Sequence, residues 1–228
     1  MTTDLVDTTE MYLRTILELE EEGVAPLRAR IAERLSQSGP TVSQTVARMQ
    51  RDNLLVVLGD RHLELTELGR ERAVGVMRKH RLAELLLVDV IGMSYEDAHD
   101  EACRWEHVMS DAVERKVFEL LKYPTHSPYG NPIPGLEALG ASTSADQIDP
   151  AERHLASNGL PATVRVTRLC ESVQTDAGVL HELHRSGVNP GALVSVEQLG
   201  DEVVITHQES TTRLSRQDAS RVFVVPAA

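Results

Sequence analysis

The chain has 228 residues, a formal net charge of −12, 41% hydrophobic and 25% charged residues. This composition is ordinary for a soluble globular protein, and the length suits one large domain or two to three small ones. No apolar run approaches the ~20 residues of a membrane-spanning helix, and the first residues lack the basic and apolar parts of a signal peptide. We therefore expect a cytoplasmic protein with no membrane partner.

The cysteine content and the charge distribution narrow the function. Two cysteines in the reducing cytoplasm favour a metal-ligand or catalytic role over a disulfide. The net negative charge argues against a nucleic-acid binder, but residues 28–51 carry five arginines and only one acidic residue. A local basic patch on an acidic body is compatible with salt-sensitive DNA binding.

The first elements in chain order predict a helix-turn-helix. The stretch from Asp7 to Glu10 resembles a capping box, and the amphipathic helix that follows is expected to end near residue 23. A short helix is predicted over residues 26–35. Gln37-Ser38-Gly39 then breaks the pattern, and Pro40 suits the first position of the next helix.

The following residues predict a β-hairpin and then longer helices. Residues 54–58 and 62–66 have the composition of two strands around a turn, so the region as a whole predicts a winged helix. Helical periodicity resumes over residues 67–90, and a further helix is expected over 95–122. Apolar residues at 82–90 and the helix at 95–122 suggest a dimer interface.

The second half of the chain changes in composition. Residues 124–161 are rich in proline, glycine and serine, which is typical of an extended linker and not of a packed element. Short β-type runs follow at 164–167, 193–196, 203–206 and 222–225, with one helix near 176–186. They predict a small β-barrel.

One motif carries the chemistry. Cys103, Glu106 and His107 stand at positions i, i+3 and i+4 of the helix expected over 95–122, so they would share one face. A thiolate, a carboxylate and an imidazole suit a first-row transition metal better than magnesium or calcium. With the thioether of Met11 added, the donors discriminate further against hard cations.

Three stretches of the chain, residues 7–15, 27–49 and 100–111, closely resemble the diphtheria toxin repressor and its iron-dependent relatives in actinobacteria. The resemblance is strong over residues 4–140 and looser beyond them. It implies a mainly α fold with β structure, comprising an N-terminal winged helix-turn-helix, a helical dimerisation domain and a C-terminal SH3-like small β-barrel. The expected bounds are 1–74 for the DNA-binding domain, 75–140 for the metal-binding and dimerisation domain, 141–160 for a linker and 161–228 for the SH3-like domain.

The resemblance also implies two metal sites in each subunit. The primary site would consist of Met11, Cys103, Glu106 and His107, with the main-chain carbonyl of Cys103. The ancillary site would consist of His80, Glu84, His99, Glu171 and Gln174. An anion beside it would bind Arg81, Ser127 and Asn131. The plain alternatives are that Met11 fills the core, that His107 is a satisfied helix histidine, and that His80 and Glu84 form a solvated surface pair.

The second helix of the turn is expected to enter the major groove of DNA. Short polar or apolar contacts to base edges would come from Ser38, Pro40, Thr41, Ser43 and Gln44. Phosphate contacts would come from Arg28, Arg48 and Arg51. The alternative for any one arginine is that it merely solvates its helix.

The resulting expectation is a repressor, not an enzyme. It would bind Fe(II) and then, as a homodimer, a palindromic operator that controls iron-uptake and iron-homeostasis genes. Co(II), Ni(II), Zn(II), Mn(II) or Cd(II) would substitute in vitro, and each operator would take one or two dimers. A cation that joins Met11 to the later donors would tie the N-terminal helix to the metal-binding helix and shift a conformational population, with residues 2–6 rearranging.

Three other functions are alternatives to an Fe(II)-activated repressor. A metallohydrolase would need an open metal position and a carboxylate base, but the H-E-x-x-H pattern and a nucleophile elbow are absent from the sequence. A Mn(II)-responsive repressor of the same fold is the main alternative, although soft sulfur donors favour iron. A metal-free winged-helix regulator with a small-molecule effector is the third.

Overall fold

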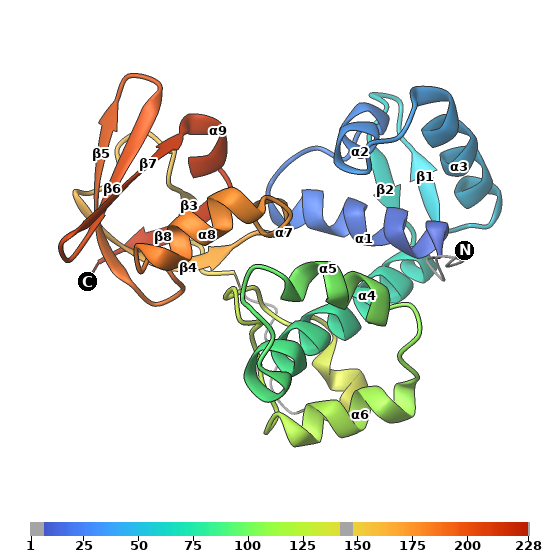
Figure 1. Ribbon diagram of the computed structural model, residues 1–228. Coiled ribbons are helices and arrows are strands. Elements are labelled where there is room, and N and C mark those ends of the chain that lie inside the picture. Colours follow the sequence, from blue (N-terminus) through green and yellow to red (C-terminus); the bar gives the residue numbers. More distant parts are fainter. Residues whose placement is uncertain (1–6, 142–147, 228) are drawn as a thin grey trace.

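The computed structural model describes residues 7–141 and 148–227. Within them the chain forms three units, which Figure 1 shows as a winged-helix unit in blue to cyan, a helical unit in green and a β unit in orange to red. The segment 2–6, for which a rearrangement is expected, lies outside the described residues. So do residues 142–147 of the expected linker.

The winged-helix unit has the predicted order of elements. Its elements are α1 (Thr8–Glu21), α2 (Arg28–Arg34), α3 (Gly39–Arg51), β1 (Leu55–Val57) and β2 (Leu63–Leu65). The side chain of Asp7 accepts hydrogen bonds from the first turn of α1, and that of Ser38 caps α3. A shared apolar core then fixes α1, α3 and the hairpin together, with buried residues that include Tyr12, Leu13, Ile16, Val46, Met49 and Leu63.

The helical unit departs from the prediction at its metal-binding helix. Helix α4 (Glu67–Leu85) runs on as a π-helix over Leu86–Ile91, and two helices follow, α5 (Ala98–Trp105) and α6 (Asp111–Leu120). The single helix expected over 95–122 is therefore wrong. The chain leaves the helix at Glu106, and the side chain of Ser110 caps a new one by accepting from Val113 N. Consequently, His107 lies beyond the end of α5.

The apolar residues expected at a dimer interface are partly buried and partly exposed. Leu82 and Leu85 are buried against Val117 and Phe118 of α6, so this part of the stripe is core. Further along, the exposed large apolar side chains of the unit are Val90, Ile91, Val108, Val113, Leu120 and Tyr123. This exposed apolar surface thus lies at the end of the π-helix, in the α5–α6 connection and on α6 and the residues after it.

The proline-rich segment is packed where an extended linker was expected. Tyr129, Asn131 and Ile133 are fully buried, and a short 3-10 helix covers Leu136–Leu139. Tyr129 belongs to the core of the β unit, and Asn131 Nδ2 donates to the carbonyl of Leu169. The prediction failed because proline and glycine restrict the backbone but do not exclude burial of the side chains between them.

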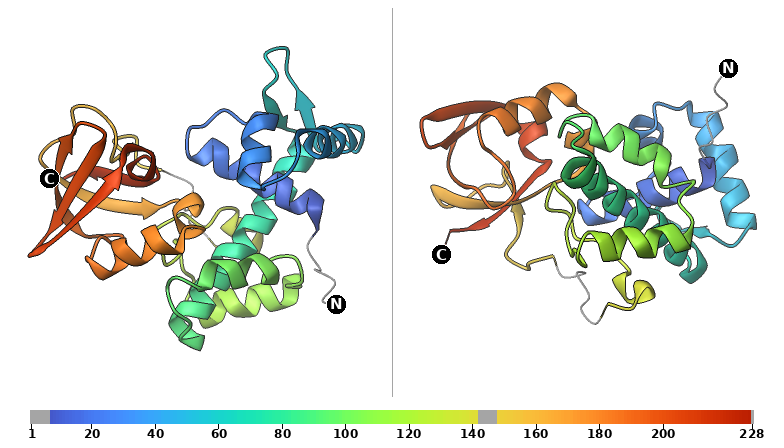
Figure 2. Two further views of the ribbon diagram at one scale, coloured as in Figure 1. Left: turned by 45° about the horizontal axis from the view of Figure 1, so that its top comes forward. Right: turned by 60° about the horizontal axis from the view of Figure 1, so that its bottom comes forward.

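The β unit is a six-stranded antiparallel sheet with the strand order β3-β8-β4-β5-β6-β7. Figure 2 shows this unit, in orange to red, from two further sides. The strands are β3 (Arg153–His154), β4 (Thr163–Leu169), β5 (Leu193–Leu199), β6 (Glu202–His207), β7 (Ser210–Ser215) and β8 (Val222–Pro226). The helices are α7 (Glu171–Gln174), α8 (Ala177–Arg185) and α9 (Arg216–Ala219). Four of the strands and α8 were predicted. Strands β3 and β7 were missed because one is very short and the other is rich in serine, threonine and arginine.

Polar contacts join the β unit to the C-terminal end of α1. Arg168 Nη2 donates to the carbonyl of Glu21, and Ser172 Oγ donates to Glu22 Oε1. As a result, α7 lies against the end of α1 (Figure 1).

Of the helices in the described ranges, none is both long and apolar enough to cross a membrane.

Candidate metal centres

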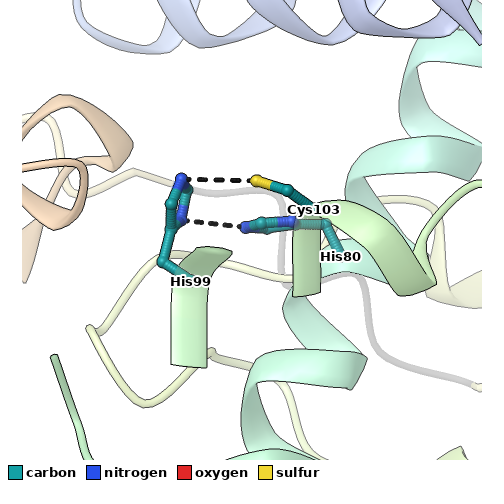
Figure 3. A group of neighbouring side chains, drawn as sticks. All are labelled: His80, His99 and Cys103. Carbon is teal, nitrogen blue, oxygen red and sulfur yellow. Dashed lines mark hydrogen bonds between the residues drawn. The ribbon is translucent and has the colours of Figure 1, made fainter. Parts of the chain in front are cut away.

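The predicted metal donors gather in one buried region between α4, α5 and α7. Figure 3 shows His80 of α4 and His99 and Cys103 of α5 pointing toward one another, and one donor atom from each lies within 4.8 Å of the others. His80 and His99 were assigned to the ancillary site and Cys103 to the primary site. The two expected sites are therefore adjacent parts of one cluster of donors.

Four of the five expected ancillary ligands are in contact. We call His80, Glu84, His99 and Gln174 the ancillary cluster. Oε1 of Glu84 lies 2.8 Å from His80 Nε2 and 3.2 Å from His99 Nδ1, and the same nitrogen of His99 lies 2.9 Å from Gln174 Oε1. His80 and Glu84 are fully buried, so the solvated surface pair is wrong. The fifth expected ligand, Glu171, instead accepts hydrogen bonds from Arg81.

Three of the expected primary ligands lie close together at the end of α5. We call Cys103, Glu106 and His107 the primary cluster. Oε1 of Glu106 is 3.2 Å from His107 Nε2, while its Oε2 is 2.7 Å from Nδ1 of His80. Cys103 Sγ lies 3.6 Å from Nε2 of His99. His80 and His99 thus connect the primary cluster to the ancillary cluster.

Helix α1 reaches the primary cluster through residues that the sequence analysis missed. Arg14 Nη1 donates to Glu106 Oε2 at 2.5 Å and to Cys103 Sγ at 3.3 Å, and Glu10 Oε2 lies 2.6 Å from His107 Nδ1. Among the hydrogen bonds of the described residues, Met11 takes part only through its main chain: its N–H donates to the carbonyl of Asp7, and its carbonyl accepts from the Thr15 hydroxyl.

A signal for the missed residues exists in the sequence. Glu10, Arg14 and Glu18 are spaced by four residues, so they form one charged line along α1 beside Met11. Arg14 and Glu18 are indeed paired, with Nε and Oε1 separated by 2.8 Å. Such a line on a helix that also buries Tyr12 predicts a polar contact with another part of the chain.

The surrounding charges keep the donors ionised. Burial alone raises the pKa of Cys103, but Arg14 and His99 outweigh it and hold that pKa well below the ordinary value for a thiol. Burial likewise opposes ionisation of Glu84, yet His80 lowers its pKa to about 2. For His99, Cys103 and Glu84 outweigh burial and raise the pKa to about 9. The cluster is therefore a buried network of opposite charges.

The donor set fits a transition metal. Thiolate sulfur, imidazole nitrogen and carboxylate oxygen are the ligands that such ions take in proteins. Oε2 of Glu84 is buried and has no hydrogen-bond partner within the described part of the chain. A buried carboxylate oxygen without a donor is costly unless a cation satisfies it. The residues that would hold metal are therefore those of the two clusters.

The expected anion site is not assembled around Arg81. Its guanidinium is fully buried and pairs with Glu21 Oε2 at 2.5 Å and with Glu171 Oε1 at 2.6 Å. Ser127 Oγ accepts from the main chain of Tyr129, and Asn131 bonds the main chain of β4. Two carboxylates thus take the place that the sequence analysis gave to an anion.

The predicted DNA-reading residues lie at the start of α3 and along its outer face. Those for base edges are all exposed, namely Ser38, Pro40, Thr41, Ser43 and Gln44. Ser38 Oγ and Thr41 Oγ1 are 2.8 Å apart at the helix start. Arg48 and Arg51 are exposed, whereas Arg28 is only partly so.

The basic patch is smaller than the sequence suggested. Arg30 pairs with Glu33, and Arg34 pairs with Glu18 and Glu22 of α1. These two arginines are therefore paired with acidic residues of the chain itself, which leaves Arg28, Arg48 and Arg51 of the predicted basic patch.

A winged helix coupled through α1 to a buried cluster of thiolate, carboxylate and imidazole defines a metal-dependent DNA-binding regulator. Three family models match this chain: the iron dependent repressor N-terminal DNA binding domain at residues 4–63, its metal binding and dimerisation domain at 66–135, and the diphtheria toxin repressor SH3 domain at 154–224. The chain belongs to the iron-dependent repressor family. Members of this family are DNA-binding transcriptional repressors and not enzymes, so the metallohydrolase alternative is set aside.

Individual relatives agree over nearly the whole length. The chain is 56% identical to the "Iron-dependent repressor IdeR" of Mycobacterium leprae, over 97% of this chain and 98% of the relative. It is 59% identical to the protein of the same name from Mycobacterium tuberculosis, over 92% and 93%. Among solved structures, a "Manganese-dependent transcriptional repressor complex with manganese" matches with a TM-score of 0.81 at 26% identity, over 96% of this chain and all of that one.

Proposed function

We propose that the chain is an Fe(II)-activated repressor of iron-uptake and iron-homeostasis genes that binds a palindromic operator in the cytoplasm. The observation that carries the proposal is the position of the primary cluster. Its three donors lie in α5 or just beyond its end, and all three contact α1 of the winged-helix unit: Arg14 bonds Cys103 and Glu106, and Glu10 bonds His107. A ligand that changes this contact changes how the DNA-binding surface is held.

The metal chemistry follows from the donors. We assign the primary site to Cys103, Glu106 and His107 with Met11, and the ancillary site to the ancillary cluster with Glu171. A bound transition metal would supply a positive charge that holds these donors together. Two metal ions per subunit are proposed, with the other divalent ions as substitutes in vitro.

Iron is favoured over manganese for two reasons. The thiolate of Cys103 and the thioether of Met11 are soft donors. In addition, relatives that are named for iron share 56–59% identity with this chain, whereas the structure named for manganese shares 26%.

The DNA and dimer surfaces are proposed from exposure. The base contacts would come from Ser38, Pro40, Thr41, Ser43 and Gln44, and the phosphate contacts from Arg28, Arg48 and Arg51. The second subunit would cover the exposed apolar side chains Val90, Ile91, Val108, Val113 and Leu120. We propose a DNA-binding domain at 1–74, a metal-binding and dimerisation domain at 75–140, and one or two dimers on each operator. The SH3-like domain begins before the expected residue 161, because β3 (Arg153–His154) pairs with β8 inside the expected linker 141–160.

A DNA-binding titration tests the proposal. The probe is a duplex that the metal-loaded protein selects from a random library, and its anisotropy is followed against Fe(II), Mn(II), Co(II), Ni(II) and Zn(II) under anaerobic, reducing conditions. Fe(II) should promote binding at lower free concentration than Mn(II). Equal binding with a metal chelator would contradict metal activation.

Two cysteine variants test the site. Cys103→Ser should raise the metal concentration needed for DNA binding by about a hundredfold, since it removes the thiolate donor. Cys170→Ser is the matched control, because Cys170 is the other cysteine of the chain and its Sγ lies 3.1 Å from Ser172 Oγ, which is not a proposed ligand. If Cys103→Ser behaves like Cys170→Ser in this assay, the primary-site assignment is wrong.

A further inference from the structure

Arg14 places a fixed positive charge among the proposed primary ligands. Its Nη1 lies 2.5 Å from Glu106 Oε2, 3.0 Å from His80 Nδ1 and 3.3 Å from Cys103 Sγ. The carboxylate oxygen of Glu106 and the sulfur of Cys103 are donors of the proposed primary site, and His80 belongs to the ancillary cluster. The guanidinium therefore uses lone pairs on the same carboxylate oxygen and the same sulfur that the metal requires.

The burial of these groups makes the contact strong. The side chain of Arg14 is 13% exposed and that of Glu106 is 1% exposed. Away from water, opposite charges attract more strongly and like charges repel more strongly. A divalent cation and the guanidinium therefore exclude each other at Glu106 and Cys103.

A second carboxylate gives Arg14 an alternative partner. Nε of Arg14 lies 2.8 Å from Glu18 Oε1, and Glu18 Oε2 lies 3.3 Å from Nη1 of Arg34. Arg14 can thus leave the primary cluster and keep an ion pair on its own helix. Met11 stands three residues earlier, so the same face of α1 would offer either a guanidinium or a thioether to the cluster.

We propose that Arg14 is an internal competitor for the metal, which enters the primary site by displacing the guanidinium from Glu106 and Cys103. The inference rests on the proposed function, because it assumes that these two residues are ligands. Its consequence is a higher metal threshold, since the protein binds metal only in the fraction of molecules whose Arg14 has left the cluster. Arg14 would then help to set the metal concentration at which the repressor responds.

The test measures metal affinity directly and not through DNA. Co(II) is titrated into the protein under anaerobic, reducing conditions, and binding is followed by the charge-transfer absorbance of a cobalt–thiolate bond. The variants are Arg14→Gln, which removes the charge, and Arg14→Lys, which keeps it. The matched control is Arg34→Gln, which removes a positive charge beside Glu18 but touches no proposed ligand.

The expected order follows from the competition. Arg14→Gln should lower the apparent Kd for Co(II) by about tenfold, the size expected for loss of one charge-assisted contact. Arg34→Gln should stay within about twofold of the wild type. Arg14→Lys should bind Co(II) with a Kd between those of the wild type and Arg14→Gln, because lysine keeps the charge but lacks the guanidinium's several donors. If the glutamine variant does not fold, Arg14→Lys carries the test, and a Kd equal to or above that of the wild type overturns the competition.

The test distinguishes failure of the proposed competition from failure of the proposed function. If the wild type shows no cobalt–thiolate band and Cys103→Ser binds Co(II) as tightly, the primary-site assignment fails. If the band is present and Arg14→Gln binds with unchanged or weaker affinity, the assignment stands and the competition is wrong. Equal tightening by Arg14→Gln and Arg34→Gln would also overturn it, because a general change of charge would then explain the result.

Discussion

The primary and ancillary clusters share a border but differ in what holds them. The ancillary cluster is closed among α4, α5 and α7, and its members bond mainly to one another. The primary cluster is held from outside, by Arg14 and Glu10 of the winged-helix unit. One cluster therefore resembles a piece of buried core, and the other resembles an interface between two units.

This difference suggests two separate roles for the clusters, although both contain metal-binding types of side chain. One role is to stabilise the junction between units, and the other is to sense the metal. A cluster that satisfies its own charges stabilises the junction of the helical and β units in any condition. A cluster whose partners belong to another unit can change that unit's position when a ligand competes for them. Sensing is thus expected at the primary cluster, and the ancillary cluster supports the geometry around it.

The largest effect should come from Arg81, which holds Glu171 outside the ancillary cluster. Arg81→Met leaves the buried carboxylate of Glu171 and the half-buried one of Glu21 without this partner, which should cost about 3–5 kcal/mol in the free energy of unfolding. Urea denaturation with a chelator present measures the cost. Arg213→Met, which breaks an exposed pair with Glu202, should cost less than about 1 kcal/mol. Equal losses would mean that the buried ion pairs of Arg81 contribute no more stability than an exposed ion pair.

The next effect is the acid sensitivity of the ancillary cluster. The pKa of Glu84 is lowered to about 2 in the folded state, so its contribution is complete above its unfolded pKa near 4.5 and is lost as the pH falls toward 2. At neutral pH this contribution is on the order of 3 kcal/mol. Glu84→Gln should be less stable than the wild type at pH 7, and the gap should narrow below pH 4.5. Parallel curves from pH 7 to 3 would contradict the assignment.

A smaller loss is expected from the primary cluster. Glu106→Gln removes the charge that Arg14 and His80 face, but Arg14 keeps Glu18 as a partner. The free energy of unfolding without metal should fall by about 2 kcal/mol. The control is Glu119→Gln on α6, an exposed carboxylate paired with Lys116, which should change stability by less than about 0.5 kcal/mol. A larger loss here than in Arg81→Met would reverse the proposed order of the clusters.

Local patterns were sufficient for the winged helix and for the types of donor. Capping residues such as Asp7 and Ser38, the break before Pro40 and the alternation in the hairpin all act over a few residues. The predicted donors His80, Glu84, His99 and Gln174 also came together as the resemblance implied. Whether they bind metal remains a prediction.

The parts that failed depend on tertiary packing. The helix break after Glu106 is fixed by the cap at Ser110, which competes with a continuous apolar pattern. Arg14 and Arg81 form these ion pairs only when the three units pack together. No local pattern in the sequence can therefore identify the carboxylate with which each arginine pairs. The spacing of Glu10, Arg14 and Glu18 shows that α1 has a charged face, but not what that face contacts.

Tyr129 has a consequence for how the molecule comes apart. Its ring is fully buried in the core of the β unit, although it precedes the linker at 141–160. The β unit is therefore completed by a side chain from the other side of that linker, and a fragment that starts at residue 148 would carry a hole of the size of a phenol ring. Cutting the linker and separating the pieces are then two different events, because the severed halves would still hold each other through Tyr129.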